Sequence, residues 1–404
     1  MRPARRVESS APRPARRVES SAPRPAVPRY GTRSLPDVLP SLLAALGVPD
    51  VAGPLHVPPV RSACVLLLDG LGWELLAGHA AEAPFLTTMA QGTTPLDAGF
   101  PATTATSIAS LGTGRSPGEH GIVGYTFAAP PTGEVLNALS WRVHGAVSGP
   151  DLRDTVPPED LQPHATMLQR AAAAGLAVRV VAPAAHRHSG LTRAALRGGE
   201  YRGVHALGDL AAGVLSALQG RALCYAYCAD LDVMGHAYGP GSMPWRLQLA
   251  HLDRLVASIV HRLPSGGLLC VVADHGMVTV PNPVDAEADV RLRHGVRVIA
   301  GDVRARHVYA EPGAAAEVLA AWREALGDRA WVLPRDEAVA AGWFGPSVLP
   351  AVLPRIGDIV VAARGRHGVV LSATEPKETA MIGHHGSLTP AEQQVPFLLS
   401  PPWS

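Results

Sequence analysis

Aspartate and histidine residues that could bind a metal ion occur at four places in the sequence. They are Asp69 in Asp69-Gly70, Asp232 with His236, Asp274 with His275, and the pair His384-His385. Carboxylates and imidazoles are the ligands of catalytic zinc and of similar borderline metals. Each short motif alone is also compatible with a salt bridge or a turn. Four of them in one chain predict a metal centre.

A run of small hydroxyl residues is the second feature that could carry chemistry. Residues 100–114 read FPATTATSIASLGTG and predict a short helix that begins after Pro101 and is stopped by Gly112 and Gly114. Free N–H groups and the helix dipole favour an anion at such an N-terminus. A hydroxyl there could attack a phosphate, although ordinary helix capping is the better explanation of such a run when it is taken alone.

Five apolar runs predict the strands that would position these groups. The runs are 63–68, 176–181, 222–229, 268–273 and 359–363, with helix-like segments at 166–174, 207–218 and 244–263. Strands that alternate with helices predict an α/β fold with a mostly parallel sheet covered on both faces. Ligands of such sheets bind beyond the carboxyl ends of the strands. The acidic and histidine motifs follow three of these strands, so we expect them to meet at that edge.

With these motifs the chain resembles the type I phosphodiesterase/nucleotide pyrophosphatase family of the alkaline phosphatase superfamily. The resemblance spans about residues 60–400 and includes all the metal motifs in the family order. The family pattern F-P-x-x-T matches Phe100–Thr104, and the patterns T-G and H-G-I-V match Thr113-Gly114 and His120–Val123. The resemblance implies an alkaline phosphatase-like three-layer sandwich with small inserted subdomains.

The resemblance also implies a catalytic site with two divalent metal ions, for which zinc is the expected element. The family ligands of one ion carry over to Asp69, Thr104, Asp274 and His275, and those of the other to Asp232, His236 and His385. The family pattern G-x-H-G selects His385 as the ligand, and His384 beside it becomes a candidate substrate contact. Thr104 becomes the nucleophile, and hydrolysis of a phosphodiester or phosphoanhydride bond then proceeds through a phosphothreonine intermediate.

The family resemblance suggests only some of the residues that would contact the substrate. The N–H of Ala105 is a candidate donor to a phosphate oxygen. Tyr125 stands where the family often has asparagine, and Thr103 stands where it commonly has lysine or arginine. His186 and His188 fall where the family inserts loops that face the substrate, with an exposed loop as the alternative.

Because Tyr125 and Thr103 differ from the family pattern at the predicted phosphate pocket, the preference for diesters over monoesters is left open. A phosphomonoesterase of the same superfamily that acts on a small phosphorylated metabolite is therefore the alternative function. A non-catalytic phosphate- or metal-binding module is a third reading, which the intact nucleophile and ligand set disfavour.

The composition divides the chain into a tail and a body. Residues 1–33 contain a tandem repeat of RPARRVESSAP with nine arginines and two glutamates, a charge of +7, and predict a disordered segment. The remaining residues carry −6, which gives no support for nucleic-acid binding. We expect residues 34–404 to form one catalytic domain with insertions at about 140–165, 183–205 and 281–355.

Partners and location follow from what the chain contains. The four cysteines lie in apolar surroundings and predict buried free thiols. No apolar run has the length of a membrane span or the continuous core of a signal peptide. We therefore expect a cytoplasmic protein without a membrane span, whose partner is a small phosphorylated substrate, with nucleotides among the candidates. The oligomeric state is not indicated.

Overall fold

A six-stranded sheet forms the centre of the computed structural model, which describes residues 25–129, 133–145 and 149–400. The strand order is β19-β9-β1-β8-β6-β7. The strands are β1 (Ser62–Leu68), β6 (Ala177–Pro183), β7 (Glu200–Val204), β8 (Ala222–Cys228), β9 (Gly267–Val272) and β19 (Phe397–Leu399). All neighbours pair in parallel except β19, which runs antiparallel to β9. The predicted α/β fold with a mostly parallel sheet is confirmed.

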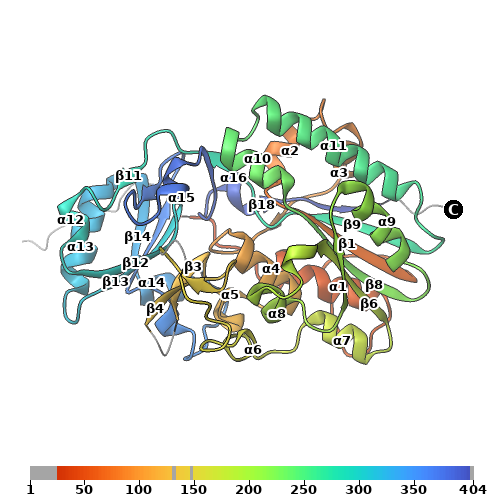
Figure 1. The fold of residues 1–404 in the computed structure, drawn as a ribbon, viewed down its shortest axis with the longest axis horizontal. Helices are drawn as coiled ribbons and strands as arrows, with labels where there is room; N and C mark the ends of the chain where they lie inside the picture. The colour runs from red at the N-terminus through yellow and green to blue at the C-terminus, as the bar shows by residue number, and fades with distance from the viewer. Residues whose placement is uncertain (1–24, 130–132, 146–148, 401–404) are drawn as a thin grey trace, which may run out of the picture.

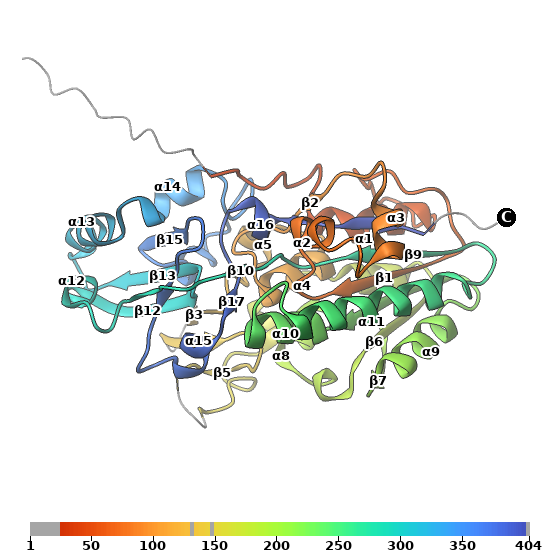
Figure 2. The same cartoon turned by 90° about the horizontal axis from the view of Figure 1, so that it is seen from above.

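Helices cover both faces of this sheet (Figures 1 and 2). Helices α9 (Leu207–Ala217) and α11 (Met243–Val260) lie on one side, and α1 (Val38–Ala45) lies on the other, while α3 (Pro84–Ala90) packs beside the edge strand β19 and contacts α11. Every residue of β1 is buried, because a central parallel strand is covered on both faces. No helix in the described part of the chain combines the length and apolar character needed to cross a membrane.

One predicted insertion belongs in part to the central sheet. Residues 183–205 were expected to lie outside the core, but β7 adds to the edge of the sheet in parallel with β6. Its sequence, Glu-Tyr-Arg-Gly-Val, is half polar, because an edge strand is only partly covered by its neighbours. This polarity made the strand look like a loop.

A second sheet forms the other end of the molecule, on the left of Figure 1. Its four strands have the order β12-β13-β15-β14 and pair antiparallel. They are β12 (Val296–Asp302), β13 (Ala305–Ala310), β14 (Ala330–Pro334) and β15 (Ile359–Ala363), and α13 (Ala315–Leu326) packs on them. The apolar run at 359–363 was predicted to be a strand of the central sheet, and the insertion was predicted to end at 355. Both statements were wrong, because a fully buried strand has the same apolar run in either sheet.

Shorter elements complete the fold. The remaining helices are α2 (Trp73–Gly78), α5 (Pro117–His120), α6 (Pro158–Leu161), α7 (Met167–Ala173), α8 (Gly190–Ala195), α10 (Asp230–Tyr238), α12 (Val290–Arg293), α14 (Arg335–Ala340), α15 (Pro376–Ala380) and α16 (Pro390–Gln393). A three-stranded sheet contains β3 (Thr126–Ala129), β4 (Glu134–Asn137) and β5 (Arg142–Val143). Three strand pairs are β2–β18 (Leu96–Asp97 with Gln394–Val395), β10–β17 (Val278–Thr279 with Gly383–His384) and β11–β16 (Val284–Asp285 with Val369–Val370).

Helix α4 (Thr104–Thr113) begins where the hydroxyl run predicted it. Gly114, with φ of 65°, ends the helix in the left-handed conformation. Gly112 does not stop the helix, contrary to the prediction. A Cβ atom at Gly112 would lie 2.1 Å from the carbonyl oxygen of Ala195, so this glycine allows α8 to approach α4.

The ordered part of the chain begins earlier in the sequence than predicted. The guanidinium of Arg29 donates 2.8 Å hydrogen bonds to both carboxylate oxygens of Asp97. The Tyr30 hydroxyl donates to the carbonyl of Trp343 and accepts from the N–H of Phe100, both at 2.9 Å. The predicted disorder therefore extends too far at residues 29–33, while residues 1–24 lie outside the described residues.

Tyr30→Phe should lower the free energy of unfolding by roughly 1–3 kcal/mol, because the buried N–H of Phe100 loses its acceptor. Urea unfolding of both proteins measures this difference. Thr32→Ala is the matched control, since its hydroxyl bonds only the exposed carbonyl of Arg29 and its loss should have little effect. Equal stability of Tyr30→Phe and the wild type would contradict the assignment.

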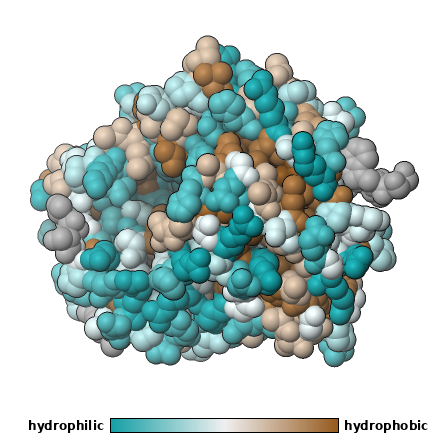
Figure 3. All heavy atoms as spheres, turned by 45° about the vertical axis from the view of Figure 1, so that its right-hand side comes forward, coloured by the Kyte–Doolittle hydropathy of each residue, from teal (hydrophilic) through white to brown (hydrophobic). Residues whose placement is uncertain are grey.

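The surface is mixed in character. Figure 3 shows one face, on which hydrophilic residues alternate with smaller hydrophobic areas. The large hydrophobic side chains exposed among the described residues include Val233, Tyr238, Met243 and Leu247, all on α10 and α11.

Candidate active site

The first group of predicted ligands lies at the carboxyl ends of β1 and β9. Asp69 follows β1, and Asp274 and His275 follow β9, which is its parallel neighbour. The Nε2 atom of His275 lies 3.5 Å from an oxygen of Asp69 and 3.5 Å from an oxygen of Asp274. The Thr104 hydroxyl at the start of α4 lies 3.2 Å from the same nitrogen. The structure therefore brings together all four residues of the first predicted set.

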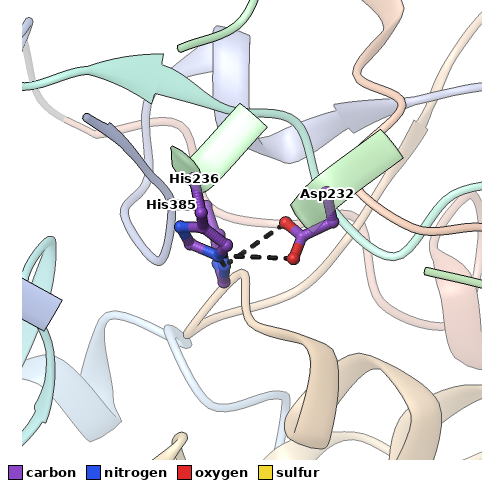
Figure 4. A group of neighbouring side chains, drawn as sticks. All are labelled: Asp232, His236 and His385. Atoms are coloured by element: carbon purple, nitrogen blue, oxygen red, sulfur yellow. Dashed lines mark hydrogen bonds and ion pairs between the residues drawn. The ribbon is translucent and has the colours of Figure 1, made fainter. Parts of the chain in front are cut away.

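The second group comes from α10 and the loop after β17. Asp232 and His236 lie one turn apart on α10, with a carboxylate oxygen 3.3 Å from Nε2 of His236. His385 contributes its Nε2, which lies 3.3 Å from that of His236 and 3.9 Å from an oxygen of Asp232. Figure 4 shows the two imidazoles turned toward the carboxylate. The rings of His385 and His275 stack with centroids 3.5 Å apart, so the two groups are adjacent.

Backbone carbonyls orient the three imidazoles. The Nδ1 atoms of His236, His275 and His385 lie 2.8, 3.0 and 2.9 Å from the carbonyl oxygens of Gly383, Gly276 and Ala102. Because a carbonyl only accepts, each Nδ1 carries the proton and each Nε2 presents its lone pair to the centre. This is the arrangement that metal-ligating histidines take.

The carboxylates fit the same interpretation. One oxygen each of Asp69, Asp232 and Asp274 is buried without a hydrogen-bond partner. Burial, followed by the charge of Asp274, raises the pKa of Asp69 well above its usual value. The ligand atoms of each group lie within 4.8 Å of one another. Unpaired buried carboxylates are costly unless a cation is bound, so both groups fit a divalent metal ion.

A family model described as type I phosphodiesterase / nucleotide pyrophosphatase matches residues 63–388. The chain belongs to this family. The family supports phosphoester hydrolase activity. A comparison with curated protein sequences finds no similar protein.

Solved structures confirm the alkaline phosphatase-like fold of this phosphodiesterase-family chain. Murine ectonucleotide pyrophosphatase / phosphodiesterase 5 is 16% identical with a TM-score of 0.64, and the alignment covers 83% of this chain and 87% of that chain. Phosphonoacetate hydrolase from Sinorhizobium meliloti 1021 is 20% identical with a TM-score of 0.61, covering 85% and 91%. At these identities the similarity shows the fold alone.

Residues that the sequence analysis missed support the ligands of this phosphodiesterase-family site. The Tyr227 hydroxyl donates a 2.5 Å hydrogen bond to the second oxygen of Asp69. The Ser107 hydroxyl on α4 donates to the carbonyl of Asp274 at 2.8 Å and so ties α4 to the segment that follows β9. Only the pairing of β8 with β1, which places Tyr227 beside Leu67, could have revealed the first contact.

Two cavities open beside the start of α4, and Thr104, Leu139 and Asp232 line both. The tyrosine lobe, of about 240 Å³, is otherwise lined mainly by apolar and hydroxyl side chains, among them Tyr201, Tyr225, Tyr227, Leu191 and Leu196. The acidic lobe, of about 200 Å³, is lined by Tyr125, Asp302, Glu375, Glu378, Met381 and His384, among others.

The predicted substrate contacts lie around these lobes. Ala105 is the second residue of α4, where an amide has no partner within the helix. Tyr125 and His384 line the acidic lobe, and Nε2 of His384 lies 3.1 Å from the carbonyl of Met381. His186 lines the tyrosine lobe, whereas His188 lines neither lobe of the described structure.

Asp302 lies in the site although no sequence motif singles it out. It comes from β12 in the second sheet and accepts a 3.2 Å hydrogen bond from the Thr103 hydroxyl. Burial raises the pKa of Asp302 to about 7. The position that is commonly basic in the family is therefore a threonine bonded to a carboxylate in this chain.

Proposed function

We propose that this protein hydrolyses phosphodiester or phosphoanhydride bonds with Thr104 as nucleophile and two divalent metal ions, zinc being the expected element. The observation that carries the proposal is the Thr104 hydroxyl, which lies at a helix N-terminus 3.2 Å from His275 and beside both ligand groups. Family membership supports the reaction class. The fold relatives were solved with AMP and with phosphonoacetate, which supports a small phosphorylated substrate, nucleotides included.

Each of the two ligand groups would hold one of the two metal ions. Asp69, Asp274 and His275 would hold one ion with Thr104, and Asp232, His236 and His385 would hold the other. Such ions supply positive charge that lowers the pKa of a coordinated hydroxyl and stabilises charge on phosphoryl oxygens.

The chain's own groups perform the displacement. The Thr104 hydroxyl releases its proton to solvent, and its oxygen forms a bond to phosphorus while the bond to the leaving oxygen breaks; the leaving oxygen takes up a proton. Water later displaces the Thr104 oxygen from phosphorus, and that oxygen regains a proton. The N–H of Ala105 donates to a nonbridging oxygen as negative charge develops there. Tyr227 holds Asp69 in place through its 2.5 Å hydrogen bond.

Turnover of bis-p-nitrophenyl phosphate and p-nitrophenyl phosphate, with and without a chelator, tests this proposal. We expect faster turnover of the diester, loss of activity on chelation, and restoration by zinc. Elemental analysis of active enzyme should find two metal ions per chain. Preference for the monoester would favour the phosphomonoesterase alternative, and no turnover of either compound would contradict an enzymatic function.

A further inference from the structure

Helix α16 lies between the central and the second sheet, near the middle of the molecule in both views (Figures 1 and 2). Its last two residues, Glu392 and Gln393, are buried. Their carbonyl oxygens accept 2.8 Å hydrogen bonds from the N–H groups of Gly276 and Ala98, respectively. Gly276 comes directly after the predicted ligands at the end of β9, and Ala98 begins the nucleophile loop, residues 98–103, which leads into α4. Helix α16 therefore contacts two of the segments that form the site.

The contact between α16 and the first ligand group is close. The carbonyl oxygen of Ala391 on α16 would lie 1.9 Å from a Cβ atom at Gly276 and 3.2 Å from one at Gly72. Gly276 follows His275, and Gly72 follows the strand that ends before Asp69. A side chain at Gly276 would therefore displace α16. The position of α16 is thus set by both strands that carry the first ligand group.

The side chain of Gln393 bridges two loops of the site. Its Nε2 donates to the carbonyl oxygens of Gly99 at 2.7 Å and Ser387 at 2.9 Å, and its Oε1 accepts from the N–H of Gly99 at 3.2 Å. Only this orientation of the amide satisfies all three bonds. Gly99 belongs to the nucleophile loop that precedes Thr104, and Ser387 belongs to the histidine loop, residues 385–389, which begins with His385.

The same two loops meet again closer to the predicted ligands. The N–H of Ala102 donates to the carbonyl of Gly386 at 3.0 Å, and the carbonyl of Ala102 accepts from Nδ1 of His385 at 2.9 Å. Together with the Gln393 bridge, these contacts attach the loops to each other at two separate points. A single point of attachment would allow one loop to pivot on the other, whereas two points define their relative orientation.

A buried ion pair anchors α16 itself. The carboxylate of Glu392 accepts from Nε of Arg304 at 3.0 Å and from its Nη2 at 2.6 Å, and both side chains are fully buried. The same carboxylate accepts from the N–H of Ser387 at 2.9 Å. A guanidinium–carboxylate pair with two parallel bonds has a defined geometry. Helix α16 is therefore a firm support from which Gln393 reaches both loops.

We propose that Gln393 is a positioning residue, which orients the nucleophile loop against the histidine loop so that the Thr104 oxygen is aligned with the phosphorus atom it attacks. The inference rests on the proposed function, because it assigns Gln393 to the reaction of Thr104. Gln393 belongs to neither ligand group and lines neither lobe. Its effect therefore passes through the position of Thr104. A misplacement of about 1 Å costs a reaction about 100-fold in rate.

Gln393→Met preserves the length of the side chain and removes all three hydrogen bonds. For the zinc-loaded enzyme we expect kcat for bis-p-nitrophenyl phosphate to fall by about 100-fold while KM changes by less than about threefold. Elemental analysis should find the same metal content as in the wild type, because the aspartate and histidine ligands are unchanged. Gln394→Met is the matched control. Gln394 is half-buried on β18, and its side chain forms no hydrogen bond among the described residues, so kcat should stay the same.

Binding of orthovanadate, measured by calorimetry, separates a positioning role from a loss of folded protein. Vanadate accepts the Thr104 oxygen as a fifth ligand and mimics the transition state, whereas inorganic phosphate does not form this bond. The fraction of folded protein changes the stoichiometry of binding and leaves Kd unchanged. In Gln393→Met we expect the Kd of vanadate to rise by about 100-fold and the Kd of phosphate to rise by less than about threefold.

A double variant shows whether Gln393 acts through Thr104. Thr104→Ala should itself weaken vanadate binding. Adding Gln393→Met to it should cause no further loss, because the residue that Gln393 positions is already absent. Gln393→Asn provides a second variant with a buried amide that is one methylene shorter and cannot reach both loops. It should weaken vanadate binding in the same direction as Gln393→Met.

Unchanged kcat and vanadate affinity in Gln393→Met would overturn the proposal. Equal losses of vanadate and phosphate affinity, or an additive loss in the double variant, would overturn it as well. Failure of both Gln393 variants to fold would assign this residue to the stability of the fold and would also refute a positioning role. A wild type that neither turns over the diester nor binds vanadate would instead count against the proposed function, so the two failures are distinguishable.

Discussion

Thr104→Ala is expected to reduce turnover by about 10⁴-fold or more, because the nucleophile of the proposed reaction is removed. The variant should still bind metal. The six aspartate and histidine ligands remain, and their positions are set by β1, β9, α10 and the loop after β17 rather than by the Thr104 side chain. Steady-state kinetics and elemental analysis of the same preparation measure both expectations.

The neighbouring hydroxyls provide the controls for this result. Thr103→Ala removes the 3.2 Å bond to Asp302 but no predicted ligand, so its effect should be far smaller. Thr104→Ser should keep part of the activity, since a primary hydroxyl remains at the same position. Acid trapping followed by mass spectrometry should find the phosphoryl group on Thr104. Phosphate on Thr103 or Thr106, or full activity of Thr104→Ala, would refute the assignment.

Stripping the metal should lower the melting temperature by several degrees, and zinc should restore it. Without a cation, one buried oxygen each of Asp69, Asp232 and Asp274 has no partner, and two of these carboxylates face each other. A ligand at about a hundredfold its Kd stabilises the folded state by roughly 3 kcal/mol. Scanning calorimetry with and without zinc measures the shift.

Asp274→Asn separates this electrostatic cause from a general loss of stability. The substitution removes the charge that raises the pKa of Asp69, so the stripped variant should melt at or above the temperature of the stripped wild type. With zinc it should gain less than the wild type, because a carboxylate ligand is missing. A stripped variant that is much less stable than the stripped wild type would contradict this explanation.

The sequence by itself determined the central strands and the residues at their ends. The strands β1, β6, β8 and β9 were predicted because continuous apolar runs identify strands that are covered on both faces. Asp69, Asp274 and His275 were expected to meet because the carboxyl ends of parallel strands share one edge of the sheet. The structure places these residues together, and their roles as ligands remain proposals.

Only the tertiary structure decided the membership of the edge and second-sheet strands. The polar edge strand β7 gave no apolar run, and β15 gave the same run as a central strand although it belongs to the second sheet. The local sequence pattern of a strand indicates how far the strand is buried. Contacts between residues distant in sequence determine which strands it pairs with.

The composition of the acidic lobe was decided in the same way. Tyr125, Asp302 and Glu378 come from three separate parts of the chain, and each is an ordinary polar residue in its local sequence. They line one cavity only because the second sheet and α15 approach the start of α4. A candidate metal ligand can be recognised in the sequence from its residue type and its position after a strand. The composition of a cavity depends instead on the packing that brings its walls together.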